Sequence, residues 1–227
     1  MTLADKVTLA RLGLMPFIVA AYLTLPPWLG FWVAGWICAL AEYTDLLDGR
    51  IARARGEVSD FGKLADPFCD VIYRIGVFLA FLLPAGGLAF AISPELAYAD
   101  IPGQLIFLSA DGSAHAGLVP WLPVFLMTLR EIVAGALRAM TATKGLVLAA
   151  RTSGKVKAWA QGATLITCLA FPAVFFQQKL WMLQWATAAT WLCAILSVVS
   201  ICEYIWVNRP VLAQLLDRKL LAERPTP

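Results

Sequence analysis

The sequence predicts an all-α integral membrane protein, a six-transmembrane-helix bundle with both termini in the cytoplasm. The chain has 227 residues, of which 60% are hydrophobic and 15% are charged. Several apolar runs are long enough to cross the ~30 Å hydrocarbon layer of a bilayer, which takes about 20 helical residues. Lys and Arg residues are concentrated in alternate connections between these runs. The composition therefore favours a membrane class over a soluble domain.

Six spans follow from the apolar runs in chain order. The first has basic residues near its start but no small-residue cleavage pattern after it, so we expect a lasting helix rather than a cleaved signal peptide. A short turn leads to the second span, a charged stretch to the third, and a long loop, 93–117, to the fourth. A basic connection precedes the fifth span and a short turn the sixth. The predicted spans are residues 7–25, 28–47, 68–92, 118–140, 159–176 and 181–207.

The distribution of basic residues sets the expected orientation. They flank the first span, fill the connections between spans two and three and between spans four and five, and follow span six, whereas the 93–117 loop has none. By the positive-inside rule, both termini and the two basic connections face the cytoplasm. We expect residues 1–207 to form one transmembrane domain and residues 208–227 a cytoplasmic tail. His115, in the non-cytoplasmic loop, is expected to be solvated.

Four of the five aspartates between residues 45 and 70 form two pairs near the junction of the second and third spans. Asp45 and Asp48 are three residues apart and Asp66 and Asp70 are four apart, so each pair lies on one face if both segments are helical. Two helices joined by a short connection are antiparallel neighbours, so we expect the pairs to meet near the cytoplasmic surface. Ionisable residues at membrane depth are costly and usually functional.

Such a group of carboxylates favours a site for hard divalent cations. Mg²⁺ and Mn²⁺ prefer oxygen ligands, and Mg²⁺ completes its shell with water and substrate phosphates. Two such ions would clamp a phosphoryl group and neutralise its attacking and leaving oxygens. Gly49 and Gly62 would let a ligand approach the backbone closely, and Arg53 is suited to hold a phosphate or an aspartate.

The spacing of these residues resembles the signature of the CDP-alcohol phosphotransferase family of integral-membrane phospholipid synthases. The matched stretch is Asp45-x-x-Asp48-Gly49-x-x-Ala52-Arg53, then eight residues, then Gly62-x-x-x-Asp66-x-x-x-Asp70. The resemblance implies a homodimeric six-helix protein that binds CDP-diacylglycerol near the cytoplasmic face. It also implies two divalent cations, Mg²⁺ or Mn²⁺, held by the four aspartates, with Asp70 as the catalytic general base. The residues it assigns to the CDP-lipid are Gly49, Ala52, Arg53, Gly62 and Thr8.

The second half of the chain is similar to the bacterial phosphatidylglycerophosphate synthases of that family. It carries an Arg-Glu pair, a second Arg on the same helix and a Gly-Lys-x-Lys turn. Arg130 and Arg138 lie on nearly one face, and a buried arginine needs an anion or an acidic partner; on an ideal helix Glu131 points about 100° away from Arg130. We expect the phosphate of glycerol 3-phosphate to bind Arg130, Arg138, Lys155 and Lys157. For the two lysines, membrane topology alone also explains a basic loop.

The expected function is phospholipid biosynthesis in the inner (cytoplasmic) membrane of a bacterium, with the active site on the cytoplasmic side. A phosphatidyl group would pass from CDP-diacylglycerol to glycerol 3-phosphate, giving phosphatidylglycerol phosphate and CMP. Inositol phosphate, inositol, serine or a lipid is the alternative acceptor. An ion-coupled transporter is the alternative from another class, because intramembrane carboxylates also build cation pathways. Membrane lipids are expected partners, and nucleic acid is not.

Overall fold

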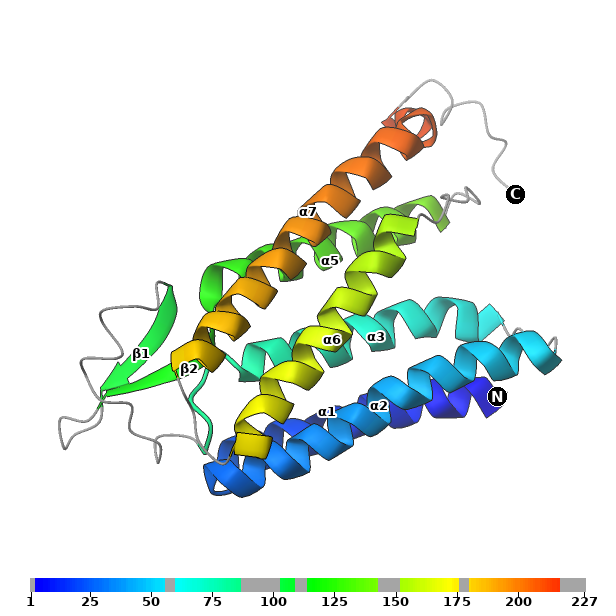
Figure 1. Cartoon of the computed structure of the whole chain (residues 1–227). Helices are drawn as coiled ribbons and strands as arrows, with labels where there is room; N and C mark the ends of the chain where they lie inside the picture. Colours follow the sequence, from blue (N-terminus) through cyan, green and yellow to red (C-terminus); the bar gives the residue numbers. More distant parts are fainter. Residues whose placement is uncertain are drawn as a thin grey trace.

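The computed structural model describes residues 3–55, 60–86, 103–108, 114–142, 152–175 and 180–216. Over these ranges the chain is mostly helical, with a two-stranded antiparallel hairpin beside the helices (Figure 1). The elements in chain order are α1 (Leu3–Thr24), α2 (Pro27–Arg55), α3 (Asp60–Ala80), β1 (Gln104–Leu108), β2 (Ala114–Pro120), α5 (Trp121–Ala142), α6 (Thr152–Phe175) and α7 (Leu180–Leu216).

Each predicted span overlaps one helix, but the predicted end of the third span is wrong. The sequence predicted a span over 68–92, whereas α3 ends at Ala80 and a turn follows over 81–86. Pro84 has no backbone N–H for a helical hydrogen bond. Gly86 has a φ of 67°, a conformation that favours glycine, and its N–H donates to the Tyr22 carbonyl at 2.8 Å. The turn is therefore fixed against α1.

A β-hairpin occupies part of the predicted 93–117 loop, so the all-α expectation was incomplete. β1 and β2 are antiparallel, with Phe107 opposite His115. β2 docks on the turn after α3, because the Leu118 N–H donates to the Phe81 carbonyl at 2.8 Å. His115 is 2% exposed, so the expectation that it is solvated was wrong. The strand also delays the start of α5 to Trp121.

An apolar core fills the end of the bundle next to the hairpin. The ring of Tyr22 packs against Phe31 and Phe81, with centroid distances of 5.8 and 5.1 Å, and its hydroxyl donates to the Leu83 carbonyl at 2.9 Å. Around this core, α1 packs against α2 and α3, α6 packs against α2 and α7, and α5 packs against α7. The buried charged side chains lie further along the helices, away from the hairpin.

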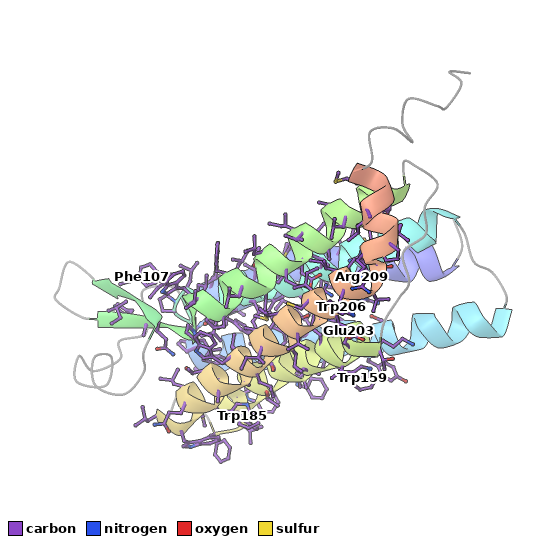
Figure 2. All side chains as sticks on the ribbon, turned by 90° about the horizontal axis from the view of Figure 1, so that it is seen from above. Phe107, Trp159, Trp185, Glu203, Trp206 and Arg209 are labelled. Atoms are coloured by element: carbon purple, nitrogen blue, oxygen red, sulfur yellow. The ribbon has the colours of Figure 1, made fainter. Side chains whose placement is uncertain are left out.

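Large apolar side chains also cover the outside of the bundle. Trp36, Trp159 and Trp206 are 69%, 69% and 68% exposed, and Figure 2 shows Trp159 and Trp185 pointing away from the helices. Large exposed apolar surface is unusual for a protein surrounded by water. Two helices, Thr152–Phe175 and Leu180–Ala213, are each long and apolar enough to cross a membrane. These observations support a membrane protein, while six spans and cytoplasmic termini stay predictions.

Candidate active site

The four aspartates lie on two helices, as the motif required. The backbone is helical through Asp45 and Asp48 in α2 and through Asp66 and Asp70 in α3. Figure 1 shows the end of α2 and the start of α3 at the end of the bundle opposite the hairpin. The side chains of Asp45, Asp48 and Asp66 fall outside the part that the structure describes, so the convergence of the four carboxylates stays a prediction.

The residues assigned to the CDP-lipid share that end of the bundle. Their backbone positions are helical: Gly49, Ala52 and Arg53 lie in α2, Gly62 in α3, and Thr8 in α1. α1 begins at the same end at which α2 finishes (Figure 1). Their side-chain surroundings also lie outside the described residues, and their role as a nucleotide site stays a prediction.

Asp70 is held by α1. Its carboxylate forms an ion pair with Arg11, whose side chain is 2% exposed, whereas the Asp70 side chain is 33% exposed. Removing one partner of an ion pair that involves a buried charge is usually strongly unfavourable. α1 thus orients the predicted general base while one third of that side chain stays open to a ligand.

Polar contacts join α2 and α3 along the segment that leads to the aspartates. The Cys38 thiol and the Tyr73 hydroxyl lie 3.3 Å apart. Arg74 donates twice to Glu42, over 3.4 Å from Nε to Oε1 and 3.2 Å from Nη2 to Oε2. The Arg74 and Glu42 side chains are only 9% and 14% exposed. The two helices therefore face each other just short of the aspartate pairs.

A second group of buried charges connects α5, α6 and α7. Arg130 donates through Nη1 to Glu131 at 2.9 Å and through Nη2 to the Ser200 hydroxyl at 2.8 Å. Lys157 contacts the other oxygen of Glu131, and both Glu131 and Lys157 are buried. The two side chains of the Arg-Glu pair meet although their helix positions differ by about 100°, because both are long enough to reach around. Two cations against one carboxylate leave one positive charge in excess.

The other two predicted phosphate ligands are arranged differently. The Nε of Arg138 donates to the Ala134 carbonyl of its own helix at 3.3 Å, and the Lys155 side chain is exposed near the start of α6. The structure therefore brings Arg130 and Lys157 together around one carboxylate, and it gives Arg138 and Lys155 no contact with that carboxylate.

Sequence reasoning missed the polar residues of α7. Ser200 accepts from Arg130, and the buried hydroxyl of Tyr204 has no hydrogen-bond partner among the residues that the structure describes. Ser200 and Tyr204 are four residues apart, so they share one helix face. This four-residue spacing of polar residues within an apolar helix is a sequence pattern that indicates a polar face on α7.

The chemistry of the aspartate set fits a hard divalent cation. Four carboxylates supply only oxygen ligands, the type that Mg²⁺ and Mn²⁺ prefer. The ion pair between Asp70 and Arg11 is consistent with an ionised carboxylate, the form that a metal ion requires. Within the described side chains, which include only Asp70 of the four aspartates, no three His, Cys, Asp or Glu residues lie together.

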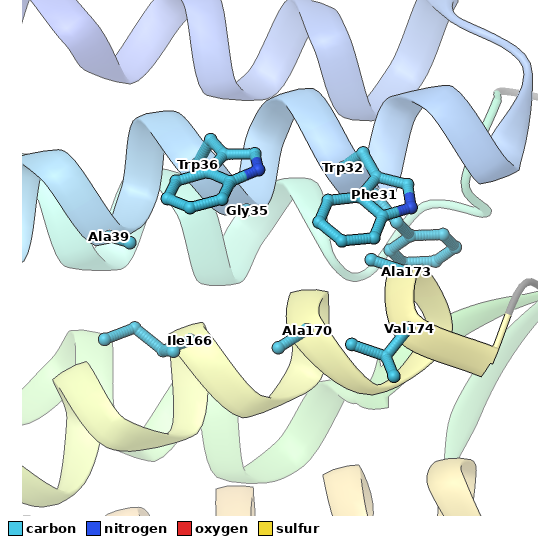
Figure 3. Close-up of a pocket in the computed structure, with 9 residues that line it drawn as sticks. All are labelled: Phe31, Trp32, Gly35, Trp36, Ala39, Ile166, Ala170, Ala173 and Val174. Atoms are coloured by element: carbon cyan, nitrogen blue, oxygen red, sulfur yellow. The ribbon is translucent and has the colours of Figure 1, made fainter.

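An apolar groove lies apart from these charges, between α2 and α6 (Figure 3). Its lining residues are Phe31, Trp32, Gly35, Trp36, Ala39, Ile166, Ala170, Ala173 and Val174. None of them carries an ionisable or nucleophilic side chain. The groove therefore offers apolar contact but no chemistry.

Comparison with known families decides the class of the chain. The CDP-alcohol phosphatidyltransferase family matches residues 1–199, a range that contains the four aspartates and the charged groups of α5 and α6. The chain belongs to this family. It is therefore a transferase of phospholipid synthesis, and the ion-coupled transporter is not supported.

This CDP-alcohol phosphatidyltransferase is similar along nearly its whole length to two bacterial proteins named CDP-diacylglycerol–glycerol-3-phosphate 3-phosphatidyltransferase. The protein from Bacillus subtilis (strain 168) is 28% identical over 221 residues, which cover 91% of this chain and 94% of the relative. The protein from Escherichia coli (strain K12) is 28% identical over 213 residues, which cover 93% of this chain and 95% of the relative.

Proposed function

We propose that this protein transfers a phosphatidyl group from CDP-diacylglycerol to glycerol 3-phosphate, giving phosphatidylglycerol phosphate and CMP. The observation that carries the proposal is the similarity, over more than nine tenths of the chain, to relatives whose names state that reaction. The family match over residues 1–199 adds the reaction class. The excess positive charge around Glu131 also supports it, because the acceptor carries a phosphate.

The four aspartates are proposed to hold two divalent cations, Mg²⁺ or Mn²⁺. Ions bound there would neutralise the attacking and leaving phosphate oxygens. The contacts between α2 and α3 support this placement of the ligands. Glu42 lies three residues before Asp45, and Arg74 lies four residues after Asp70, so the facing surfaces lead directly to the two aspartate pairs.

Asp70 is proposed as the general base. Its carboxylate takes the proton of the acceptor hydroxyl, and the acceptor oxygen forms a bond to the β-phosphorus of CDP-diacylglycerol. The bond from that phosphorus to the oxygen of CMP breaks, and CMP leaves. Arg11 keeps the Asp70 carboxylate in place during this step. The residues proposed to surround the CDP group are Gly49, Ala52, Arg53, Gly62 and Thr8.

The acceptor phosphate is proposed to bind the basic residues of α5 and α6. Arg130 and Lys157 are already fixed by Glu131 and need little rearrangement to receive an anion. Arg138 and Lys155 complete the proposed set. Charge-assisted hydrogen bonds from arginine and lysine to phosphate are among the stronger polar contacts in proteins, so this set favours a phosphorylated acceptor over inositol or serine.

The proposed setting is the inner membrane of a bacterium. We infer a homodimer with six spans per chain, both termini and the active site in the cytoplasm, and membrane lipids around the apolar exterior. The exposed tryptophans support a lipid surround.

An acceptor panel tests the proposal. Purified protein in detergent or nanodiscs would receive CDP-diacylglycerol, Mn²⁺ or Mg²⁺, and labelled glycerol 3-phosphate, inositol phosphate, inositol or serine in separate reactions. We expect CMP and a labelled lipid with glycerol 3-phosphate only. Release of CMP with another acceptor alone would refute the acceptor, and no metal-dependent release with any acceptor would refute the reaction.

Asp66→Asn is the matched catalytic variant. It keeps the size of the side chain but removes the charge of a proposed metal ligand, so we expect CMP release to fall to background. Unchanged release by a correctly folded Asp66→Asn protein would contradict the assignment of the aspartates.

A further inference from the structure

We propose that Glu42 and Arg74, with Gly162 packed against them, act as a positioning pair that fixes the distance between the two aspartate-bearing helix segments. This inference rests on the proposed function, because it assigns the pair a role in that reaction. Neither residue is part of the aspartate motif or of the basic set. Both belong to the helices that carry the motif.

The contact is a bidentate ion pair between two helices. Arg74 uses Nε and Nη2 together, each toward a different oxygen of Glu42, at 3.4 and 3.2 Å. A two-point contact of this kind fixes orientation as well as distance, which a single ammonium group cannot do. Both side chains are largely buried, so water does not compete freely for either partner.

The pair lies close enough to the aspartates along both helices to affect their positions. Glu42 is three residues from Asp45, and Arg74 is four residues from Asp70. At 1.5 Å of rise per residue these separations are roughly 4.5 and 6 Å along the axes. A change of spacing at the pair is therefore passed almost directly to the aspartates. A displacement of about 1 Å at a reacting centre can reduce a rate by on the order of 100-fold.

A third helix holds the pair from the side. A Cβ atom added to Gly162 of α6 would lie 2.5 Å from Oε2 and 3.0 Å from Cδ of Glu42. A larger residue at this position would therefore require the Glu42 carboxylate, the far end of a flexible side chain, to shift. The carboxylate therefore has Arg74 on one side and the backbone of α6 on another, which leaves it little freedom to move.

Thermodynamics also favours a role in geometry over a role in stability. A buried ion pair contributes little net stability compared with well-packed apolar residues, because both charges lose their hydration. Its best-supported use is to select one register between packed elements. The pair between α2 and α3 lies about one turn from Asp45 and Asp70, and about two turns from Asp48 and Asp66. The register that it sets between the two helices therefore bears on the four carboxylates proposed to share cations.

The first experiment measures the spacing itself. Tyr43 of α2 and Phe68 of α3 are 58% and 48% exposed, so Tyr43→Cys and Phe68→Cys can carry spin labels in a background in which the exposed Cys202 is changed to Ser. Pulsed electron paramagnetic resonance then gives the distance distribution between α2 and α3. We expect Gly162→Ala to shift or broaden it, because the new methyl group displaces the Glu42 carboxylate from Arg74 without removing a charge.

The control is Gly135→Ala on α5, where an added Cβ meets no atom within 4 Å. It should leave the distance distribution unchanged. Arg74→Lys is the second variant, since it keeps the positive charge but loses the two-point contact. It should broaden the distance distribution as Gly162→Ala does. If Gly162→Ala does not fold, Arg74→Lys alone tests the positioning role.

The second experiment connects spacing to the site. Mn²⁺ binding to the purified protein, followed by its paramagnetic resonance signal, should weaken on the order of 10- to 100-fold in Gly162→Ala and Arg74→Lys, while KM for glycerol 3-phosphate stays close to the wild-type value. A lower unfolding temperature with unchanged Mn²⁺ affinity and unchanged spacing would overturn the positioning role. If wild-type protein neither binds Mn²⁺ nor releases CMP, the proposed function fails instead.

Discussion

The buried Glu131 side chain is at the centre of a group of polar contacts between helices. Its two oxygens receive Arg130 and Lys157, which come from α5 and α6, and Arg130 continues to Ser200 of α7. A carboxylate shared by two cations offsets charges that would otherwise repel each other in a medium of low dielectric. Glu131 therefore links α5 directly to α6, and Arg130 extends this group of polar contacts to α7.

We predict that Glu131→Gln destabilises the protein by roughly 3–5 kcal/mol, the usual cost of removing one partner from a buried ion pair. Thermal unfolding of the purified protein in detergent measures the effect. Lys155→Gln is the control, because Lys155 is exposed and its loss should leave the unfolding temperature almost unchanged. Equal unfolding temperatures for the two variants would show that the contacts of Glu131 with Arg130 and Lys157 do not contribute to stability.

Sequence reasoning found the aspartates because their spacing is local. Asp45 and Asp48, or Asp66 and Asp70, share a helix face whatever surrounds them, so the motif can be identified without a structure. The partners of Arg130 and Arg74 could not be found this way. Ser200 is 70 residues from Arg130 and Glu42 is 32 residues from Arg74, and such pairings depend on which helices pack together.

The hairpin is the element that the sequence analysis missed. A signal was present: Asp111-Gly112 stands between two apolar runs, and Asp-Gly is a strong indication of a hairpin turn. The long apolar runs on either side favour membrane helices, so hydropathy alone does not reveal this turn. The early end of α3 was missed for the same reason, because the sequence stays apolar past Ala80 while Pro84 and Gly86 favour a turn.

We predict that Gly117→Ala loosens the hairpin. An added Cβ would lie 2.3 Å from the carbonyl oxygen of Leu82, and because this atom belongs to the backbone, β2 must move away from the turn after α3. Overpacking of this kind costs about 1–3 kcal/mol. Hydrogen exchange of the Leu118 amide, which donates to Phe81, should become faster.

The matched control for this element is Gly135→Ala in α5. No atom lies within 4 Å of the added methyl group, and alanine is favoured over glycine inside a helix by about 1 kcal/mol. We expect this variant to be at least as stable as the wild type. If Gly117→Ala is as stable as the wild type and the Leu118 amide exchanges at an unchanged rate, the prediction is contradicted. In that case β2 accommodates the methyl group without moving away from Leu82.

At the scale of the whole molecule, the two ends of the bundle differ in character. Figure 1 shows the hairpin at one end, and at the other the end of α2, the starts of α3 and α6, and the end of α7. The positive-inside rule predicts that the second of these ends is cytoplasmic. The orientation rests on the distribution of loop charges alone and stays a prediction, and that distribution carries no information on how the helices pack.

We predict that Lys155→Cys and Leu105→Cys, each in a Cys202→Ser background, react with a membrane-impermeant maleimide from opposite sides. Lys155 is exposed near the start of α6 and Leu105 is 38% exposed in the hairpin. Labelling of Lys155→Cys should occur in inverted vesicles and that of Leu105→Cys in intact spheroplasts. Labelling of both from one side would contradict the predicted topology.

The apolar packing of Tyr22, Phe31 and Phe81 beneath the hairpin has a consequence for the supply of lipid to the membrane. A polar headgroup would find few polar partners among these rings, so, on the proposed function, this packing opposes passage of the product through the described part of the bundle to the far leaflet. Each molecule made would join the leaflet that supplied its precursor. Equal growth of both leaflets would then depend on a separate protein that moves lipids across the bilayer.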